Sequence, residues 1–173
     1  SVAAVDRLGT GRYGMFVTGY GAPARFYEVG DDGGITDLAD AVGLDVVTGG
    51  RSVAAGPILS DRTDVFVGAE RGPNLLLRNV GGTFVDVARE YGVADAEENA
   101  RGAALVAPNG AATPDIVCGN WNGETRLFAR EGDAFVDAAP PALARPARVR
   151  TVVAADFDND GRHALFVNVL GAP

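Results

Sequence analysis

Short apolar stretches alternate with glycine-rich turns along the whole chain, in an order that returns about every fifty residues. Each period holds about four such stretches, and their length is typical of strands rather than helices. The repetition is clearest in a set of residues that recurs 150 positions later, where Asp6, Gly11, Arg12, Phe16 and Val17 become Asp156, Gly161, Arg162, Phe166 and Val167. This period predicts repeat units at residues 1–50, 51–100, 101–150 and 151–173, the last of them about half complete.

Each unit is predicted to form four short strands. The first is small and apolar, as suits a strand near a central axis, and turns that contain glycine or proline separate the others. The first strands are expected at 2–5 and 152–155, the second at 15–17, 65–67 and 116–118, the third at 25–29, 75–79 and 126–130, and the fourth at 35–38, 83–87 and 134–138. Residues 87–92 are expected to form one helical turn that ends at Gly92.

Four strands in each fifty residues are typical of a propeller blade, meaning one four-stranded sheet of a β-propeller. The predicted fold class is therefore all-β, a β-propeller domain or propeller fragment over residues 1–173 with three full blades and a half. A β-solenoid and a β-sandwich would also give many short strands. The period is too long for a solenoid coil and too regular for a sandwich, which favours the propeller.

Charge and composition exclude several classes of partner. The net charge is −8 and all fifteen basic residues are arginine, without a basic run, so the chain lacks the positive surface that nucleic acids require. No apolar stretch approaches the roughly twenty residues of a transmembrane helix, and no signal peptide opens the chain. An acidic composition without lysine fits either a salt-adapted (halophilic) protein or a GC-rich genome.

No catalytic constellation is recognisable, and we predict that the chain is not an enzyme. Cys118 lies in an apolar run, where a small buried hydrophobic residue is expected, and His163 has no serine or cysteine partner in a recognisable motif. A degenerate hydrolytic propeller is a weaker hypothesis. It would need acidic residues along the central channel, whereas the predicted first strands are mostly valine and alanine.

An acidic loop at the start of the last unit is the candidate metal site. Asp156, Asp158 and Asp160 occupy loop positions one, three and five before Gly161, and Arg162 at position seven could offer its backbone carbonyl. This spacing directs alternate carboxylates toward one hard cation, so a weakly bound calcium ion is expected. The alternative is a solvated acidic turn whose aspartates bond to their own backbone. His163 is expected to be a surface residue rather than a ligand.

Three motifs together carry a resemblance to a known family. They are the acidic loop running into Leu165-Phe166-Val167, Gly119-Asn120-Trp121-Asn122-Gly123, and the Gly-Thr-Phe-Val-Asp of 82–86. In these motifs the chain resembles the FG-GAP/VCBS repeat family, most strongly its ASPIC/UnbV, or cartilage acidic protein-like, group. The resemblance implies a calcium-binding propeller, commonly of seven blades, located extracellularly or at the cell surface and used for binding or cell adhesion.

The chain departs from the family pattern within its loops. The family usually has aspartate at position nine of the acidic loop, where this chain has Ala164, so the resemblance implies one negative ligand fewer and a weaker site. The corresponding loops at 6–11, 56–61 and 109–111 lack the full set of carboxylates and are interpreted as degenerate.

The predicted turns between second and third strands carry Tyr20, Glu70-Arg71 and Trp121-Asn122 at equivalent places. In a propeller these turns share the face opposite the acidic loops. Tyr20, Trp121 and Asn122 could there contact a protein or a glycan, or Trp121 could instead pack between blades. The leading hypothesis is a non-catalytic binding or adhesion module whose calcium loop stabilises a blade. The alternative is a glycan-binding, lectin-like propeller.

A half blade would leave an unpaired strand edge. Both ends of the chain carry the same first two strands of the repeat, so they cannot complete each other. The chain is therefore expected to be either a fragment of a longer propeller or one half of a homodimer.

Overall fold

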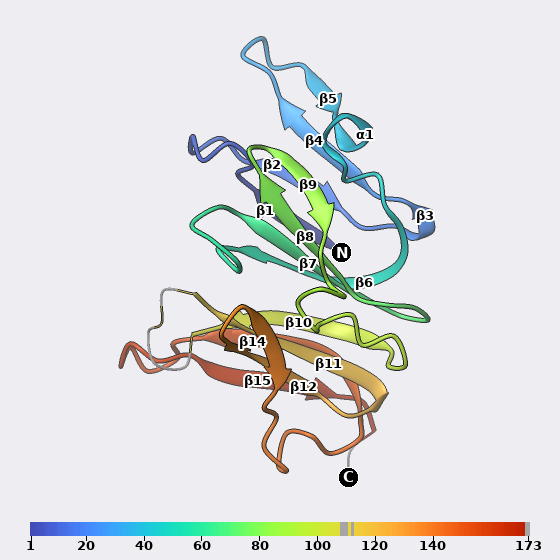
Figure 1. Cartoon of the computed structure of the whole chain (residues 1–173), viewed down its shortest axis with the longest axis vertical. Helices are drawn as coiled ribbons and strands as arrows, with labels where there is room; N and C mark the ends of the chain where they lie inside the picture. The colour runs from blue at the N-terminus through green and yellow to red at the C-terminus, as the bar shows by residue number, and fades with distance from the viewer. Residues whose placement is uncertain (108–110, 112, 172–173) are drawn as a thin grey trace.

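The chain folds into a series of antiparallel sheets, each built from strands that follow one another in sequence (Figure 1). The computed structural model describes residues 1–107, 111 and 113–171. The first sheet has the order β1-β2-β4-β5. Its strands are β1 (Val2–Val5), β2 (Gly14–Val17), β4 (Arg25–Val29) and β5 (Ile35–Asp37).

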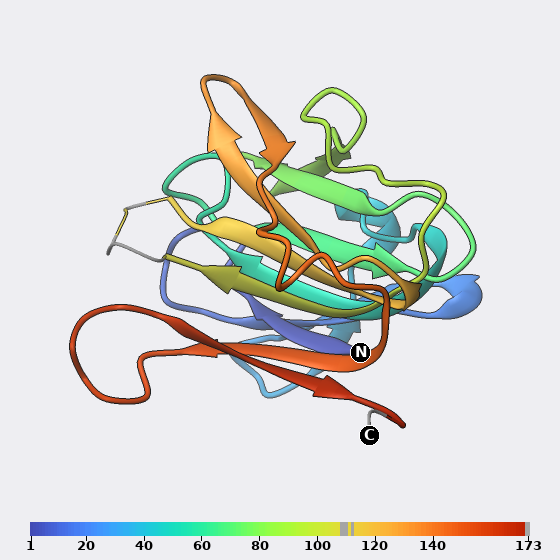
Figure 2. The same cartoon turned by 90° about the horizontal axis from the view of Figure 1, so that it is seen from below.

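The next two units repeat this arrangement. In the second sheet, pairing runs through β6 (Val47–Gly56), β7 (Asp64–Ala69), β8 (Leu75–Val80) and β9 (Thr83–Asp86). In the third it runs through β10 (Ala100–Val106), β11 (Asp115–Gly123), β12 (Arg126–Glu131) and β13 (Ala134–Asp137). The last unit is the hairpin of β14 (Ala147–Ala155) and β15 (Ala164–Val169), which lies at one end of the molecule (Figures 1 and 2). The prediction of an all-β chain is confirmed, and in each of the first three units the pairing runs through four consecutive strands of the repeat, although pairing between units enlarges two of the sheets.

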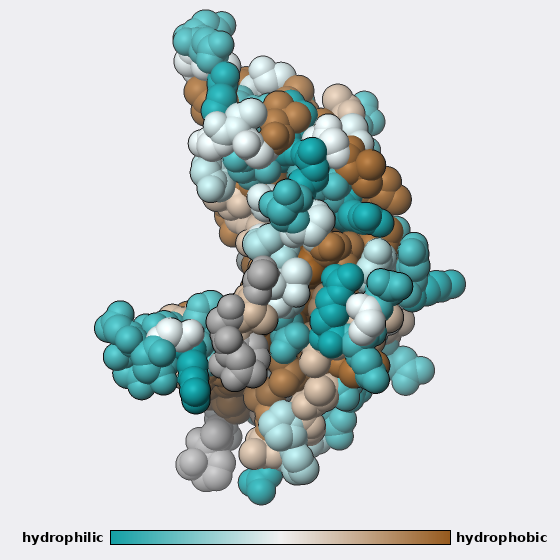
Figure 3. Space-filling model, turned by 60° about the vertical axis from the view of Figure 1, so that its left-hand side comes forward, coloured by the Kyte–Doolittle hydropathy of each residue, from teal (hydrophilic) through white to brown (hydrophobic). Residues whose placement is uncertain are grey.

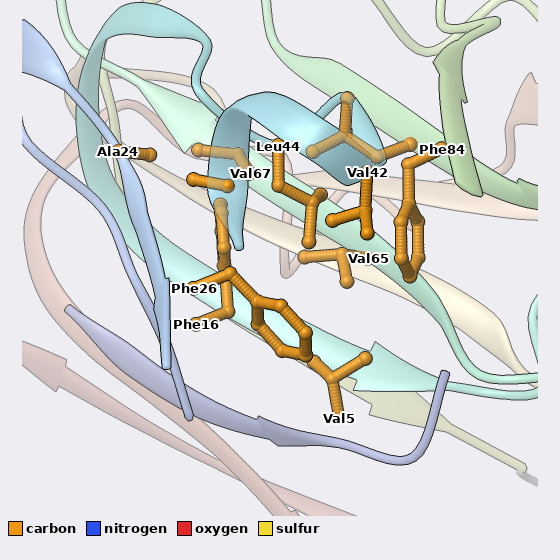
Figure 4. Packing of buried hydrophobic residues seen from close by; sticks show 11 residues of the cluster. Val5, Phe16, Ala24, Phe26, Val42, Leu44, Val65, Val67 and Phe84 are labelled. Atoms are coloured by element: carbon orange, nitrogen blue, oxygen red, sulfur yellow. The ribbon is translucent and has the colours of Figure 1, made fainter. Parts of the chain in front are cut away.

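Hydrophobic cores lie between successive sheets rather than within one layer. Phe16 and Phe26 of the first sheet meet Val65, Val67 and Phe84 of the second (Figure 4). The following two cores join the second sheet to the third and the third to the β14–β15 hairpin. Every residue of β7 is buried, because the second sheet is covered on both faces.

A short helical segment follows the fourth strand in the first two units. In the first it is α1 (Ala39–Val42), which ends at Gly43 with a φ of 75°. A Cβ atom at Gly43 would lie 2.5 Å from the carbonyl oxygen of Phe84, so glycine meets both a conformational and a steric need. In the second unit a single turn ends at Gly92, with a φ of 78°, against the carbonyl oxygen of Phe135. The helical turn expected at 87–92 is therefore present as a hydrogen-bonded turn that packs on the next sheet.

Neighbouring units are linked by additional strand pairing. This pairing was not predicted from the sequence. β3 (Tyr20–Pro23) follows the second strand and pairs with the start of β6, and the end of β11 pairs with the start of β14. As a result, β14 begins at Ala147, earlier than the short first strand expected at 152–155. In the space-filling view the molecule is hollowed on one side (Figure 3). Within the described residues, the only helix is far too short to cross a membrane.

Candidate metal loop and candidate ligand face

The acidic loop connects β14 to β15 and holds three carboxylates together. Ligand oxygens of Asp156, Asp158 and Asp160 all lie within 4.8 Å of one another, and no other such group of potential metal ligands occurs among the residues that the structure describes. Asp158 and Asp160 are exposed and Asp156 is partly buried. Oxygen donors at this spacing are the ligand type that calcium prefers.

Asp156 holds the backbone of this loop in place. Its carboxylate accepts hydrogen bonds from the backbone N–H groups of Asp160 at 3.0 Å and Gly161 at 2.9 Å. These bonds, led by the one from Gly161, lower the pKa of Asp156 below its usual value, so the group is ionised at neutral pH. Asn159 and Gly161 have left-handed backbones, with φ of 59° and 85°. Asp160 accepts a hydrogen bond from the N–H of Arg162, whose own carbonyl would complete the predicted ligand set.

In the equivalent loop of the first unit, the first aspartate likewise holds the backbone of the turn, without the two further acids. Asp6 accepts backbone N–H bonds from Gly9, Thr10 and Gly11 at 2.8, 3.1 and 2.6 Å. Leu8 and Thr10 stand where Asp158 and Asp160 stand in the last unit. One aspartate is therefore sufficient to form this turn, and the second and third acids of the 156–161 loop are not required by its backbone.

The second loop has become part of the hydrophobic core. Ile58 is fully buried against the third sheet, while the buried Asp64 accepts N–H bonds from Leu59 and Asn79. Burial raises the pKa of Asp64. Of the third loop, Asn109 and Gly110 lie outside the described residues.

The predicted ligand residues lie beside arginines that the sequence reading did not single out. Tyr20 is 50% exposed, and the Arg51 guanidinium lies 4.2 Å from its ring centroid. Arg101 lies 4.1 Å from the Trp121 ring centroid. Tyr20 therefore lies against the first strand of the following unit, and Trp121 lies against the first strand of its own unit. In both cases a cation–π contact covers part of the ring.

Asn122 lies apart from this aromatic and arginine surface. Its side-chain oxygen accepts a hydrogen bond from Arg148 at 3.2 Å, and the two residues line a different pocket from Arg101. Asn122 also has a left-handed backbone, with a φ of 61°, where the strand pairing of β11 with β14 is irregular. The three predicted ligand residues do not form one continuous pocket.

His163 and Cys118 occupy positions of the kinds expected. His163 is exposed, and its Nδ1 accepts a hydrogen bond from the backbone N–H of Ala107. Cys118 is buried in the core between the second and third sheets, and burial raises its pKa to about 12. A thiol held so far from ionisation is a poor nucleophile at neutral pH.

Comparison with known proteins identifies the repeat. Residues 109–167 match the family model described as FG-GAP-like repeat. This part of the chain is an FG-GAP-like repeat.

Curated relatives of this FG-GAP-like repeat protein share its sequence over nearly its full length. It is 41% identical over 186 aligned residues to cartilage acidic protein 1 of Homo sapiens and of Mus musculus, and 40% identical to that of Xenopus tropicalis. These alignments cover 97% of this chain but only 28% to 29% of the relatives. The chain therefore spans less than a third of the length of the relatives that it matches, and the resemblance to the cartilage acidic protein-like group is confirmed.

The FG-GAP-like repeat also explains what the sequence reading missed. Arginines 51, 101 and 150 recur at about the repeat period, yet each lies alone between small or apolar residues. Their spacing was a signal that could have been found by superimposing the units and looking for polar, rather than apolar, periodicity.

Proposed function

We propose that this chain is a non-catalytic binding or adhesion module that forms part of a β-propeller. The observation that carries the proposal is the packing of successive four-stranded sheets face to face, in a chain that contains an FG-GAP-like repeat. Blades of a propeller pack in this way around an axis, and their connecting loops form binding surfaces at the two ends. Family resemblance also supports an extracellular or cell-surface location.

Exposed apolar residues at the two ends of the stack of sheets support the proposal that this chain is part of a larger propeller. On the outer face of the first sheet, Val2, Met15 and Ile35 are 58%, 48% and 72% exposed and line an apolar hollow of about 650 Å³. On the other end, Phe166 is 56% exposed. Exposed apolar surface of this kind marks an interaction site, and we propose that further blades cover it, from a longer chain or from a second copy.

Calcium bound by the 156–161 loop is the metal part of the proposal. The carboxylates of Asp156, Asp158 and Asp160, with the carbonyl of Arg162, would hold the ion. The residues fit this role because Asp158 and Asp160 are not needed to form the turn, as the first unit shows, where Asp6 alone holds the corresponding backbone. A bound cation would offset the repulsion among the three carboxylates and so stabilise the β14–β15 hairpin.

Thermal unfolding with and without calcium tests the metal site. At a calcium concentration ten times the dissociation constant, binding to the folded state stabilises it by about 1.4 kcal/mol, a rise of several degrees in Tm. We expect this rise in the wild type and not in Asp158→Ala. Asp133→Ala is the matched control, because Asp133 is an exposed acid in another hairpin turn. Equal calcium responses of wild type and Asp158→Ala would rule out the loop as the site.

A glycan-binding propeller is the second candidate function. The half-exposed ring of Tyr20 favours it, because aromatic rings that keep one face free stack on sugars. A glycan array separates the two candidates: a lectin would retain defined saccharides and lose them in Tyr20→Ala, whereas a protein-binding module would retain none. This result is independent of the calcium measurement.

A further inference from the structure

Three arginines occupy the same irregular position in successive first strands. Arg51 lies between the paired residues Gly50 and Ser52 of β6, where the register with β7 shifts. The register of β10 with β11 shifts in the same way at Arg101, and that of β14 with β15 at Arg150. A bulge turns the side chain of its extra residue out of the regular alternation of the strand, and bulges often lie beside functional sites. The repeat therefore directs three guanidinium groups to one surface.

The three arginines and the residues of the neighbouring turns form one connected row. Arg51 contacts both the Tyr20 ring and, through its Nε, Glu70 at 2.6 Å. Glu70 also binds Arg101 at 2.6 Å. Beyond Arg101, the Trp121 ring lies under both Arg101 and Arg150, the latter at 5.6 Å. Stacking and ion pairing fix the planes of Arg51 and Arg101, so their remaining donors are held in place.

This row carries more positive than negative charge. Arg51, Arg101 and Arg150 line a common pocket of about 260 Å³. Glu70 is the carboxylate that pairs with the first two, and Arg150 has no ion-pair partner among the described residues. The Nε of Arg101 is buried and has no hydrogen-bond partner within the described part of the chain. A buried donor on a charged group is costly when it is unpaired.

We propose that this pocket binds a small tetrahedral oxyanion, a sulfate or phosphate group, through Arg51, Arg101 and Arg150. Planar guanidinium groups donate paired hydrogen bonds to such oxygens, and one carboxylate neutralises only one of the three cations. The protein as a whole is acidic, with a net charge of −8, so a pocket lined by three arginines differs in sign from the average charge of the chain. The site does not depend on the calcium loop.

Trp121 offers a direct signal for this binding, because it is the single tryptophan of the chain and lies under two of the three arginines. Sodium sulfate, added to the wild-type chain, should change its fluorescence saturably, while sodium chloride at the same ionic strength should not. In Arg150→Gln the dissociation constant for sulfate should rise about tenfold, the loss of one charged hydrogen-bonding group. Arg101→Gln should lose the response.

Arg148→Gln is the matched control. Arg148 lies on the same strand as Arg150 and is exposed, but it binds Asn122 and lines another pocket. Its removal deletes the same charge and should leave the sulfate titration unchanged. The proposal is overturned if chloride reproduces the change, or if Arg150→Gln titrates like the wild type while it keeps the wild-type circular dichroism spectrum.

The bound sulfate could be a free inorganic anion or an ester on a saccharide, and a further titration separates these two sources. A sulfated disaccharide is compared with inorganic sulfate and with the same disaccharide lacking sulfate. Tighter binding of the sulfated disaccharide than of inorganic sulfate assigns the pocket to a saccharide ester, and equal binding assigns it to the free anion. Binding of the unsulfated disaccharide alone would contradict the proposed oxyanion site.

Discussion

The first and last units begin with closely similar segments, 6–17 and 156–167, that differ in their surroundings. Both turn through left-handed residues at equivalent places, Gly9 and Gly11 in one and Asn159 and Gly161 in the other. Phe16 is fully buried between the first and second sheets, whereas Phe166 is 56% exposed at the free end of the stack. The local backbone thus follows from the segment itself, while burial depends on whether another sheet lies against it.

The 6–11 and 156–161 loops likewise share a local backbone and differ in the side chains added to it. Asp6 and Asp156 make equivalent bonds to the backbone, so both loops are formed by short-range interactions. Only the 156–161 loop adds two carboxylates that the backbone does not need for the turn. Turn geometry and metal-binding potential can therefore vary independently within one repeat.

The largest expected difference is in the two phenylalanines. Phe16→Ala removes a large buried side chain and should lower the free energy of unfolding by about 3–5 kcal/mol. Phe166→Ala should lower it by less than about 1 kcal/mol, because the ring is more than half exposed. Urea unfolding of both variants measures the difference. Similar losses would mean that Phe166 is covered in solution, and light scattering would then show whether a second copy covers it.

A smaller effect is expected when the acids of the last loop are transferred to the first. Leu8→Asp combined with Thr10→Asp gives the 6–11 loop the carboxylates of the 156–161 loop on a backbone that already has the required turn. Calcium should then raise the stability of this variant by about 1 kcal/mol more than that of the wild type. The measurement is the calcium-dependent shift in Tm.

The single variants Leu8→Asp and Thr10→Asp are the controls for this transfer. Each lacks one carboxylate and should respond less than the double variant. A double variant with the wild-type response would show that three acids on this turn are not sufficient for calcium, and that the 156–161 loop requires ligands from outside its own segment.

Much of the fold could be predicted because it depends on local, periodic signals. Apolar runs that end at Val17 and Val67, and the turns at Gly81 and Gly82, mark strands and hairpins directly. The pairing of β3 with β6 could not be read in the same way, because Tyr20-Gly21-Ala22-Pro23 has the composition of a turn and becomes a strand only through contact with the next unit.

The two candidate sites also differ in whether their residues are close together in the sequence. The acidic loop is contiguous, so its carboxylates could be found from spacing. The pocket of Arg51, Arg101 and Arg150 joins residues about fifty positions apart, and each arginine by itself is typical of an exposed strand end. The spacing of the arginines is visible in the sequence, but their convergence on one pocket depends on the bulges, which are properties of strand register.

The smallest expected effect concerns acid pH, and it tests whether the two loops are equivalent without metal. Hydrogen bonds from the backbone, led by that of Gly11 for Asp6 and that of Gly161 for Asp156, lower both pKa values from the usual 3.8. Because the folded-state pKa is the lower one, each carboxylate stabilises the fold fully above pH 3.8 and loses this contribution as pH falls through the folded-state value. In EDTA, Asp6→Asn and Asp156→Asn should each make the free energy of unfolding less dependent on pH below about 4, by similar small amounts, since both sets of hydrogen bonds lie in exposed loops. With calcium present, only Asp156→Asn should diverge further, because the ion requires ionised ligands.

The free energy of unfolding of both variants and of the wild type is measured by urea unfolding between pH 2.5 and pH 6. If both variants depend on pH in the same way as the wild type, these backbone hydrogen bonds do not favour the ionised carboxylate.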